Sequence, residues 1–573
     1  MRSWIIGVAC LGLAVGAAQA GPVNVTIDGA RRAAPVSPYE YGMFIEPIGG
    51  LVARTLWAEM LEDRKFYYPV VAEARDTPPP LNAEGRPGVS YRKWRPVGGD
   101  DVVTMDTEAP YAGAQSASVA LVAGQHRGLS QSGIGVAKAK RYDGYVLLSG
   151  DPNAKVEVSL VWGPGAADRQ TIALPAPDRG WKRAPFSFTP TADAADARLE
   201  ITGLGSGRFR IGAASLMPSD NIRGWRADTT AIARSLNSGV WRLPGGNFLS
   251  NWDWHGAIGP RDGRAPMFDH AWSAMQSNDI GMDEWLDLTR ILGVEPYVTV
   301  DAGLGDANSA AEEVEYLNGP ATSPWGARRA ANGHPEPYGV KFWNIGNEPY
   351  GWWQIGKTSL DYFMIKHNRF AAAMRAADPT ITLIGSGAMP DQMHPRGAKE
   401  NASLESIQPK FGTEWDWTGG LFAKAWGNFD GISEHWYDRP EKRPEAPADA
   451  ELIEYARAPS NQVRMKAEEW KIYEQRFPGA KDKKIFLSID EYAYFGVTNL
   501  KSALAYSMVL QEMLRHTDFL TMAAFTTGAS TMDITPTDAT LNTTGAVFKL
   551  YGEHFGAGVT PLAVTGDAPQ PQP

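Results

Sequence analysis

Eight short apolar runs, each ending in polar or glycine residues, recur along the chain. They are "YGMFIEP" (41–47), "SGVWRLPGG" (238–246), "GVEPYVTVDAG" (293–303), "GVKFWNIGNEP" (339–349), "ITLIGSG" (381–387), "FDGISEHWYD" (429–438), "KIFLSIDEYA" (484–493) and "FLTMAAFTTG" (519–528). Segments with helical periodicity lie between several of them, at 282–293, 360–379 and 500–516. Continuous apolar strands that alternate with amphipathic helices are typical of parallel βαβ units. Eight such strands predict an α/β fold of the (β/α)8 TIM-barrel type.

An open doubly wound sheet is the alternative arrangement of the same elements. That fold usually carries a glycine-rich phosphate-binding turn at the start of a helix. The sequence has no such turn, so the closed barrel is favoured.

The pattern changes between residues 88 and 217. Short alternating stretches such as "KVEVSLVW" and "RFRIGAASL" are separated there by glycine, proline, aspartate and asparagine turns. This pattern predicts an antiparallel β-sandwich inserted after the first barrel strand. The predicted organisation is therefore a barrel start at 21–80, the insert at 88–217, the rest of the barrel at 222–556 and a Pro-rich tail at 557–573.

The first twenty residues, "MRSWIIGVACLGLAVGAAQA", have the pattern of a signal peptide with cleavage after Ala20. A periplasmic or secreted protein is expected, with lipoprotein processing at Cys10 as the weaker alternative. Cys10 is the one cysteine of the chain, so the mature protein would have no disulfide, thiol nucleophile or thiolate metal site. No second long apolar run suggests a membrane span.

Composition narrows the range of partners. Hydrophobic residues make up 43% and charged residues 21%, as is ordinary for a soluble globular protein. The formal net charge of -10 argues against nucleic acid and anionic membranes as partners. Twenty tryptophans and twenty tyrosines suit either stacking on sugar rings or an aromatic core. A homo-oligomer is left open.

Candidate chemistry lies where the predicted strands end, because barrel active sites form at the C-terminal ends of strands. Glu348 ends the fourth strand and Glu491 ends the seventh, so they should face each other across the barrel mouth. Paired carboxylates are what glycoside hydrolysis needs, one as acid and one as nucleophile or base. The same strand ends carry further polar residues: Glu46, Asn247, Asp301, Asn347, His435, Tyr437 and Asp490.

The two carboxylates have different sequence surroundings. Glu348 is followed closely by Tyr350, Trp352 and Trp353, and aromatic burial would raise its pKa. Glu491 would need hydrogen-bond donors to stay charged. A single glutamate at a strand end could equally be a cap or a salt-bridge partner, and His435 could be a core histidine. Nucleophilic-serine "GxSxG" and metal-binding "HExxH" motifs are absent from the sequence.

Two motifs give a resemblance to a known family. "NIGNEPYGWWQIG" and "SIDEYAYFG" resemble the acid/base and nucleophile motifs of glycoside hydrolase family 51, the α-L-arabinofuranosidases. "YGMFIEPIGG", "WRLPGGNFLSNWDWHGAIGP" and "DGISEHWYD" resemble the first, second and sixth strands of that family. The likeness covers about residues 38–70 and 222–556.

The resemblance implies a role for each matched residue. Glu348 would be the general acid/base and Glu491 the nucleophile of a retaining mechanism, with carboxyl groups about 5–5.5 Å apart. Asn347 would bind the sugar 2-hydroxyl, and Tyr437 would position the nucleophile. The substrate would be arabinofuranosyl linkages in plant-type polysaccharides or oligosaccharides, and no metal or organic cofactor is implied. Four residues would bind or line the sugar pocket: Glu46, Asn247, Trp254 and His435.

Departures from the family pattern leave other functions open. Pro47 and Ala524 replace polar residues of the glycone pocket, which keeps xylosidase, glucanase or galactofuranosidase activity in view. A non-catalytic carbohydrate-binding protein is disfavoured by the presence of both glutamates. The family's C-terminal sandwich would be missing, truncated or replaced by the insert. The insert itself resembles carbohydrate-binding modules, with aromatic residues that are either stacking or core residues: Trp94, Tyr111, Tyr142 and Trp162.

Overall fold

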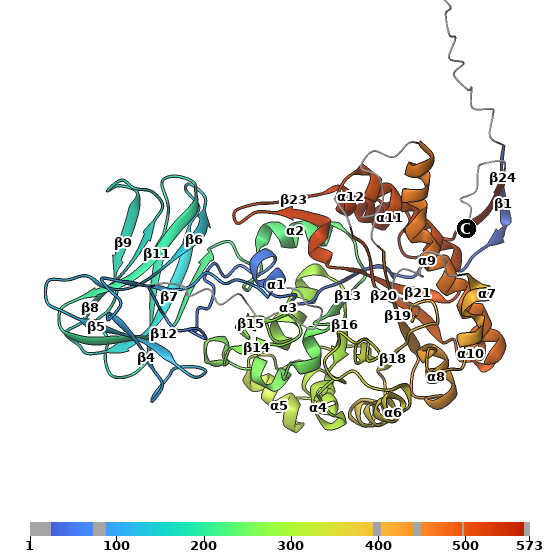
Figure 1. Cartoon of the computed structure of the whole chain (residues 1–573), viewed down its shortest axis with the longest axis horizontal. Coiled ribbons are helices and arrows are strands. Elements are labelled where there is room, and N and C mark those ends of the chain that lie inside the picture. The colour runs from blue at the N-terminus through green and yellow to red at the C-terminus, as the bar shows by residue number, and fades with distance from the viewer. Residues whose placement is uncertain (1–23, 73–87, 394–402, 439–448, 496–497, 567–573) are drawn as a thin grey trace, which may run out of the picture.

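The computed structural model describes residues 24–72, 88–393, 403–438, 449–495 and 498–566. The predicted signal peptide lies outside these residues. The described chain forms a barrel, a separate β-sandwich and a small two-stranded ribbon (Figure 1).

The barrel is a closed sheet of eight parallel strands in chain order, which confirms the predicted fold class. The first strand closes it by pairing with both the second and the eighth. The strands are β2 (Tyr39–Phe44), β13 (Val240–Leu243), β16 (Glu295–Val300), β17 (Phe342–Ile345), β18 (Thr382–Ser386), β19 (Gly431–Asp438), β20 (Phe486–Tyr494) and β21 (Leu520–Thr526).

Helices cover the outside of the barrel and account for the helical periodicity of the sequence. They are α1 (Leu51–Thr55), α2 (Ala227–Ser235), α3 (Met282–Leu292), α4 (Ala307–Asn318), α5 (Pro324–Ala331), α6 (Leu360–Ala377), α7 (Leu404–Ile407), α8 (Trp417–Lys424), α9 (Asp449–Arg476), α10 (Gly479–Asp482), α11 (Leu500–Met513) and α12 (Thr543–His554). Side chains cap several of them; Asp306, for example, accepts from the backbone N–H groups of Asn308 and Ser309. Among the described helices, none combines the length and apolarity needed to cross a membrane.

Both faces of the barrel strands are buried, which explains their continuous apolar runs. The strand bases fill the barrel interior with large apolar side chains, including Tyr297, Phe342 and Met522. Glu348, His435 and Glu491 lie toward the other ends of the strands. Short elements decorate that end and the connections: β14 (Met267–Asp269), β15 (Ala274–Gln276), β22 (Met532–Ile534), β23 (Ala539–Leu541), η1 (Phe248–Asn251), η2 (Trp254–Ala257) and η3 (Arg261–Gly263).

The sandwich lies between the first and second barrel strands in sequence, as predicted, and beside the barrel in space (Figure 1). Its two five-stranded sheets have the orders β10-β7-β12-β5-β4 and β3-β6-β11-β8-β9, and all their pairs are antiparallel. The strands are β3 (Arg95–Val97), β4 (Val103–Asp106), β5 (Ser116–Leu121), β6 (Arg127–Val136), β7 (Tyr142–Gly150), β8 (Lys155–Val161), β9 (Arg169–Ala173), β10 (Lys182–Phe188), β11 (Ala194–Leu204) and β12 (Gly207–Pro218).

The segment expected to begin the barrel also builds other parts of the molecule. Leu61, Phe66 and Val70 pack into the sandwich core rather than into the barrel. They follow α1, so the chain leaves the barrel soon after its first strand. The barrel portion of residues 21–80 is thus shorter than the sequence pattern suggested.

The first and last described strands pair in a ribbon away from the sandwich. β1 (Val25–Arg32) pairs antiparallel with β24 (Leu562–Gly566), at the opposite end of the molecule in Figure 1. Neither strand belongs to the barrel, although 21–80 was expected to start it and 557–573 to be a tail. The last part of that predicted tail, 567–573, lies outside the described residues.

Candidate active site

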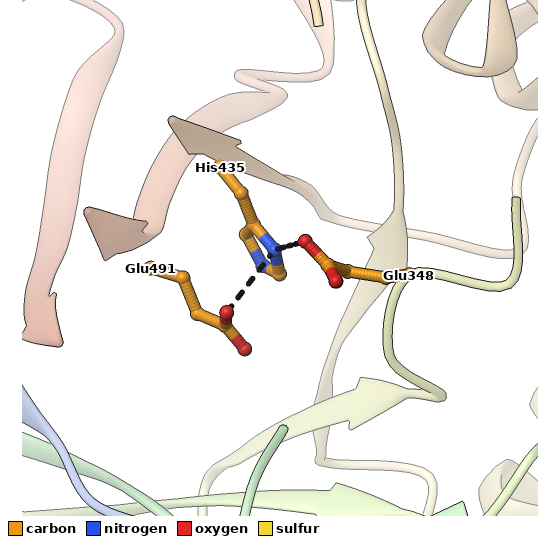
Figure 2. A group of neighbouring side chains, drawn as sticks. All are labelled: Glu348, His435 and Glu491. Carbon is orange, nitrogen blue, oxygen red and sulfur yellow. Dashed lines mark hydrogen bonds and ion pairs between the residues drawn. The ribbon is translucent and has the colours of Figure 1, made fainter. Parts of the chain in front are cut away.

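The fourth and seventh strands bring the two candidate carboxylates together at the barrel mouth. Glu348 stands three residues beyond the end of β17, and Glu491 lies within β20. His435 and Tyr437 project from β19, the strand next to β20. Figure 2 shows the His435 ring between the two carboxylates, with interactions to both.

A β-bulge turns two consecutive acidic residues toward the same site. Glu434 pairs with Ile489, but the next pair is His435 with Glu491, so Asp490 is the extra residue on β20. A bulge redirects side chains in this way and is common beside active sites. As a result Asp490 and Glu491 both reach Arg242, at 3.8 Å and 2.7 Å.

Glu348 is held in an unusual backbone conformation. Its φ of +40° lies in the left-handed region that non-glycine residues rarely occupy. One carboxylate oxygen is 2.9 Å from His435 Nδ1 and 3.4 Å from the Tyr350 hydroxyl, and the other accepts from the Trp353 indole N–H at 2.5 Å. Strain of this kind costs on the order of 1–3 kcal/mol and persists where the surroundings fix the side chain.

Glu491 accepts strong hydrogen bonds on both oxygens. Arg242 donates to Oε1 at 2.7 Å, and the Tyr437 hydroxyl donates to Oε2 at 2.7 Å. Arg242 is fully buried and also donates to the Asn347 side-chain oxygen at 2.8 Å. These charge-assisted and hydroxyl hydrogen bonds hold the Glu491 side chain in a fixed orientation.

His435 links the acidic residues to one another. Its Nδ1 lies 2.9 Å from Glu348 and 3.5 Å from Glu491, and its Nε2 lies 3.2 Å from Asp490. Burial disfavours its charge, but Glu491, Asp490 and Glu348 outweigh burial and raise the pKa of His435 to about 10. His435 therefore belongs to this acidic cluster and not to the apolar core.

The pKa of Glu348 is lowered, whereas the sequence predicted that it would be raised. Burial does favour a higher pKa, but the hydrogen bond and charge of His435 outweigh burial and lower the pKa. The sequence argument considered only aromatic neighbours of Glu348. Trp352 is 53% exposed, so it desolvates Glu348 less than expected.

The spacing of the carboxylates restricts their chemistry. One oxygen of Glu348, one of Glu491 and a ring nitrogen of His435 all lie within 4.8 Å of one another. Retaining glycosidases hold their carboxyl groups about 5–5.5 Å apart, whereas inverting enzymes need about 6.5–9.5 Å. The same three groups could hold a metal ion, but Arg242, Tyr437 and Trp353 already donate to the carboxylates.

The structure places three more predicted residues around this centre. Asn347 is buried beside Glu348 and bound to Arg242. Glu46 accepts hydrogen bonds from the Phe248 backbone N–H at 2.8 Å and the Trp272 indole N–H at 2.6 Å. Burial and, to a smaller extent, the charge of Glu491 raise the pKa of Glu46 well above its usual range. The buried side-chain oxygen of Asn247 has no hydrogen-bond partner among the described residues. Asn247 thus offers an acceptor to a ligand.

Trp254 does not have the predicted place. It is 3% exposed, packs against Tyr316 and Trp325, and donates its indole N–H to Ser309. These partners belong to or flank α4 and α5, outside the hydrogen-bonded centre.

The aromatic residues of the insert are mostly core residues. Trp94, Tyr142 and Trp162 are all buried, while Tyr111 is half-buried and packs edge-on against Trp181. None of the three buried rings presents a face for stacking on a sugar.

Several site residues were missed from the sequence. Arg242 lies within an apolar strand, and a cation in such a run was the available signal. Trp353 was noted only for its bulk, although its indole holds Glu348. Thr526, on the eighth strand, hydrogen-bonds Tyr437 at 3.0 Å, whereas Ala524 is fully buried two residues earlier.

Comparison with known proteins points to one family. Residues 232–428 match the model of the alpha-L-arabinofuranosidase 1 domain. An intracellular exo-alpha-(1->5)-L-arabinofuranosidase of Bifidobacterium longum is 33% identical over 227 residues, which are 39% of this chain and 37% of the relative. Alpha-L-arabinofuranosidase C of Emericella nidulans is 36% identical over 170 residues, 30% of this chain and 34% of the relative. The matches therefore span little more than a third of these relatives.

Solved structures extend the likeness in fold. An arabinose-bound family 51 α-L-arabinofuranosidase superimposes with a TM-score of 0.69 at 18% identity, covering 95% of this chain and 84% of that one. A family 51 enzyme of Bifidobacterium longum gives a TM-score of 0.52 at 23% identity, over 61% of this chain and 70% of that one. At these identities the superpositions establish the shared fold.

Proposed function

We propose that this chain, which over part of its length is similar to α-L-arabinofuranosidases, hydrolyses α-L-arabinofuranosides with retention of anomeric configuration. The observation that carries this proposal is that one carboxylate oxygen of Glu348, one of Glu491 and a ring nitrogen of His435 lie within 4.8 Å of one another. The two carboxylates are also held differently, one by His435 and Trp353 and the other by Arg242 and Tyr437. Such asymmetry is what separate acid and nucleophile roles require.

Glycosylation begins with attack of the Glu491 carboxylate on the anomeric carbon. A bond forms between Glu491 and that carbon while the bond to the leaving oxygen breaks. Arg242 and Tyr437 aim the carboxylate, so little reorganisation is needed at the moment of attack. Glu348 delivers a proton to the leaving oxygen, which departs as a neutral alcohol.

The proton that Glu348 delivers is shared with His435 before substrate binds. In the free protein it resides mainly on His435, as the raised pKa of His435 and the lowered pKa of Glu348 both indicate. The 2.9 Å contact between His435 Nδ1 and Glu348 gives the proton a direct path to the carboxylate. Asp490 and Ser433 hold the opposite ring nitrogen and thereby fix the orientation of the imidazole.

Hydrolysis of the covalent intermediate reverses these roles. Glu348, now ionised, takes a proton from water as the water oxygen attacks the anomeric carbon. The bond to Glu491 breaks and its carboxylate is restored. Retention follows from two successive inversions at the same carbon.

Buried polar residues around the nucleophile would bind the sugar hydroxyls. Asn347 lies next to Glu348 and is oriented by Arg242, which suits it to the 2-hydroxyl. Asn247 contributes its unpaired oxygen, and Glu46 contributes the carboxyl group fixed by Phe248 and Trp272. A site built to hydrogen-bond hydroxyl groups discriminates strongly against sugars that lack them.

Export and a polysaccharide substrate are part of the same proposal. The signal-peptide pattern of residues 1–20 supports export, and an exported glycosidase would meet extracellular plant-type glycans. Amino-terminal sequencing of the mature protein should begin at Gly21. A first residue of Met1 or Cys10 would contradict this part of the proposal.

A panel of aryl glycosides tests the activity. The 4-nitrophenyl α-L-arabinofuranoside should be hydrolysed, and Glu491→Ala should lose that activity while remaining folded. Aryl xylosides, glucosides and galactofuranosides are tested as alternative substrates, and their rates of hydrolysis are compared. Faster turnover of one of them, lost in the same variant, would transfer the proposal to that sugar.

A further inference from the structure

An exposed tryptophan stands beside the catalytic acid. Trp352 is 53% exposed and belongs to the turn that follows Glu348. Its ring lies 5.7 Å from that of Trp353 at an interplanar angle of 84°, and Trp353 is the donor to Glu348. Trp352 is therefore one aromatic contact away from the group that protonates the leaving oxygen.

The turn that carries Trp352 is rigidly anchored. Gly351 N–H donates to the Glu348 carbonyl at 2.8 Å, and Gln354 N–H donates to the Gly351 carbonyl at 3.0 Å. The buried side chain of Gln354 is hydrogen-bonded to Ser250. The Trp352 indole is therefore exposed on a turn that hydrogen bonds hold in place.

A second exposed apolar side chain lies on the neighbouring loop. Leu304, after β16, is 66% exposed, and its backbone N–H donates to the Ser250 carbonyl at 3.1 Å. Ser250 thus ties the Leu304 loop and the Trp352 turn together. The loops also touch directly, because a Cβ on Gly356 would meet Gly303 at 2.6 Å. Contiguous exposed apolar groups at the edge of a site are typical of ligand-binding surfaces.

We propose that Trp352, supported by Leu304, is the platform on which the leaving-group sugar stacks. The inference rests on the proposed function, since Glu348 defines the leaving-group side only if it is the acid. The leaving group lies beside the acid, and Trp352 is the exposed ring four residues along the chain from Glu348. An aromatic face matches the apolar C–H face of a pyranose ring. The favoured substrate is an arabinofuranosyl branch on a pyranose chain.

Two substrates with the same glycone separate this role from catalysis. Methyl α-L-arabinofuranoside has no ring in its leaving group, whereas an arabinofuranosyl-substituted xylotriose has pyranose rings there. Trp352→Ala should lower kcat/KM for the xylotriose about tenfold and leave that for the methyl glycoside unchanged, since aromatic contacts contribute up to about 1.5 kcal/mol. Trp352→Phe should restore most of the loss.

Trp426→Ala provides the matched control. Trp426 is 40% exposed but precedes β19, at the end of the barrel away from the mouth, so both substrates should be unaffected. Equal losses on both substrates in Trp352→Ala, or no loss on the xylotriose, would overturn the platform. Absence of turnover of either substrate by the unmodified protein would instead overturn the proposed function on which it rests.

Discussion

At the scale of single residues, Arg242 compensates the negative charge of the site. It is fully buried, and its guanidinium reaches Glu491, Asp490 and Asn347. Arg242→Lys would keep the charge but lose the planar fork that contacts several acceptors at once. We expect kcat/KM on the aryl arabinofuranoside to fall by roughly a hundredfold or more, as on removal of other preorganised donors. An unchanged kcat/KM in this variant, measured on folded protein, would contradict the role.

His435 makes stability depend on pH in a defined window. Its folded-state pKa of about 10 exceeds the value of about 6.5 expected in the unfolded chain. The stabilisation from protonated His435 is therefore complete below pH 6.5 and is lost as pH rises toward 10. His435→Gln lacks this term, so its deficit in Tm relative to the unmodified protein should shrink between pH 6.5 and 10. Thermal unfolding of both proteins at three pH values measures the difference in Tm. A difference that stays constant with pH would contradict the raised pKa of His435.

Candidate site residues were predictable where they follow directly from the end of a predicted strand. Glu348, Glu491 and Asn347 follow from the ends of the fourth and seventh strands. The pKa direction of Glu348 was wrong because its dominant partner, His435, comes from another strand. The packing of Trp254 against Tyr316 and Trp325 was not predictable, because it joins residues far apart in the sequence.

At the scale of elements, closure of the barrel depends on a close approach at Gly42. A Cβ there would meet the Ala523 carbonyl oxygen at 2.4 Å and Val240 Cγ1 at 2.5 Å, on the two strands that flank β2. Gly42→Ala should lower the free energy of unfolding by about 1–3 kcal/mol, as overpacked cores do. Gly29→Ala on β1, where nothing lies within 4 Å, is the control that should change little. Denaturant unfolding compares the two, and equal effects would contradict the account.

The eight barrel strands were predictable because each is apolar on both faces. The β1–β24 ribbon was not, because its pairing joins residues more than five hundred positions apart with little buried surface. The bulge at Asp490 was equally hidden, since the run "SIDEYA" reads as a regular strand.

At the scale of the whole molecule, a buried ion pair connects the barrel to the segment that leads from α1 into the sandwich. Arg64 and Asp279 are both buried and bond through two guanidinium nitrogens, at 2.6 Å and 2.7 Å. Asp262 joins them, contacting both Arg64 and Tyr145 of the sandwich. These partners are about two hundred residues apart in sequence, so no local pattern could pair them.

Removing one partner would leave a buried charge uncompensated. Arg64→Ala should lower the free energy of unfolding by about 3–5 kcal/mol. The exposed pair Arg141–Asp143 supplies the comparison, because Arg141→Ala should cost less than about 1 kcal/mol. Unfolding in denaturant, followed by circular dichroism, measures both variants. Similar losses of unfolding free energy in the two would contradict a stabilising role for the buried pair.

The central claim is double displacement through Glu491, and the stereochemistry of transfer to methanol tests it most directly. Hydrolysis of the aryl α-L-arabinofuranoside in the presence of methanol traps the glycosyl group as a stable methyl glycoside, whose anomer is read by NMR. Two displacements predict methyl α-L-arabinofuranoside, with none formed by Glu491→Ala. Formation of the methyl β-anomer would mean a single displacement and would contradict the mechanism assigned to Glu348 and Glu491.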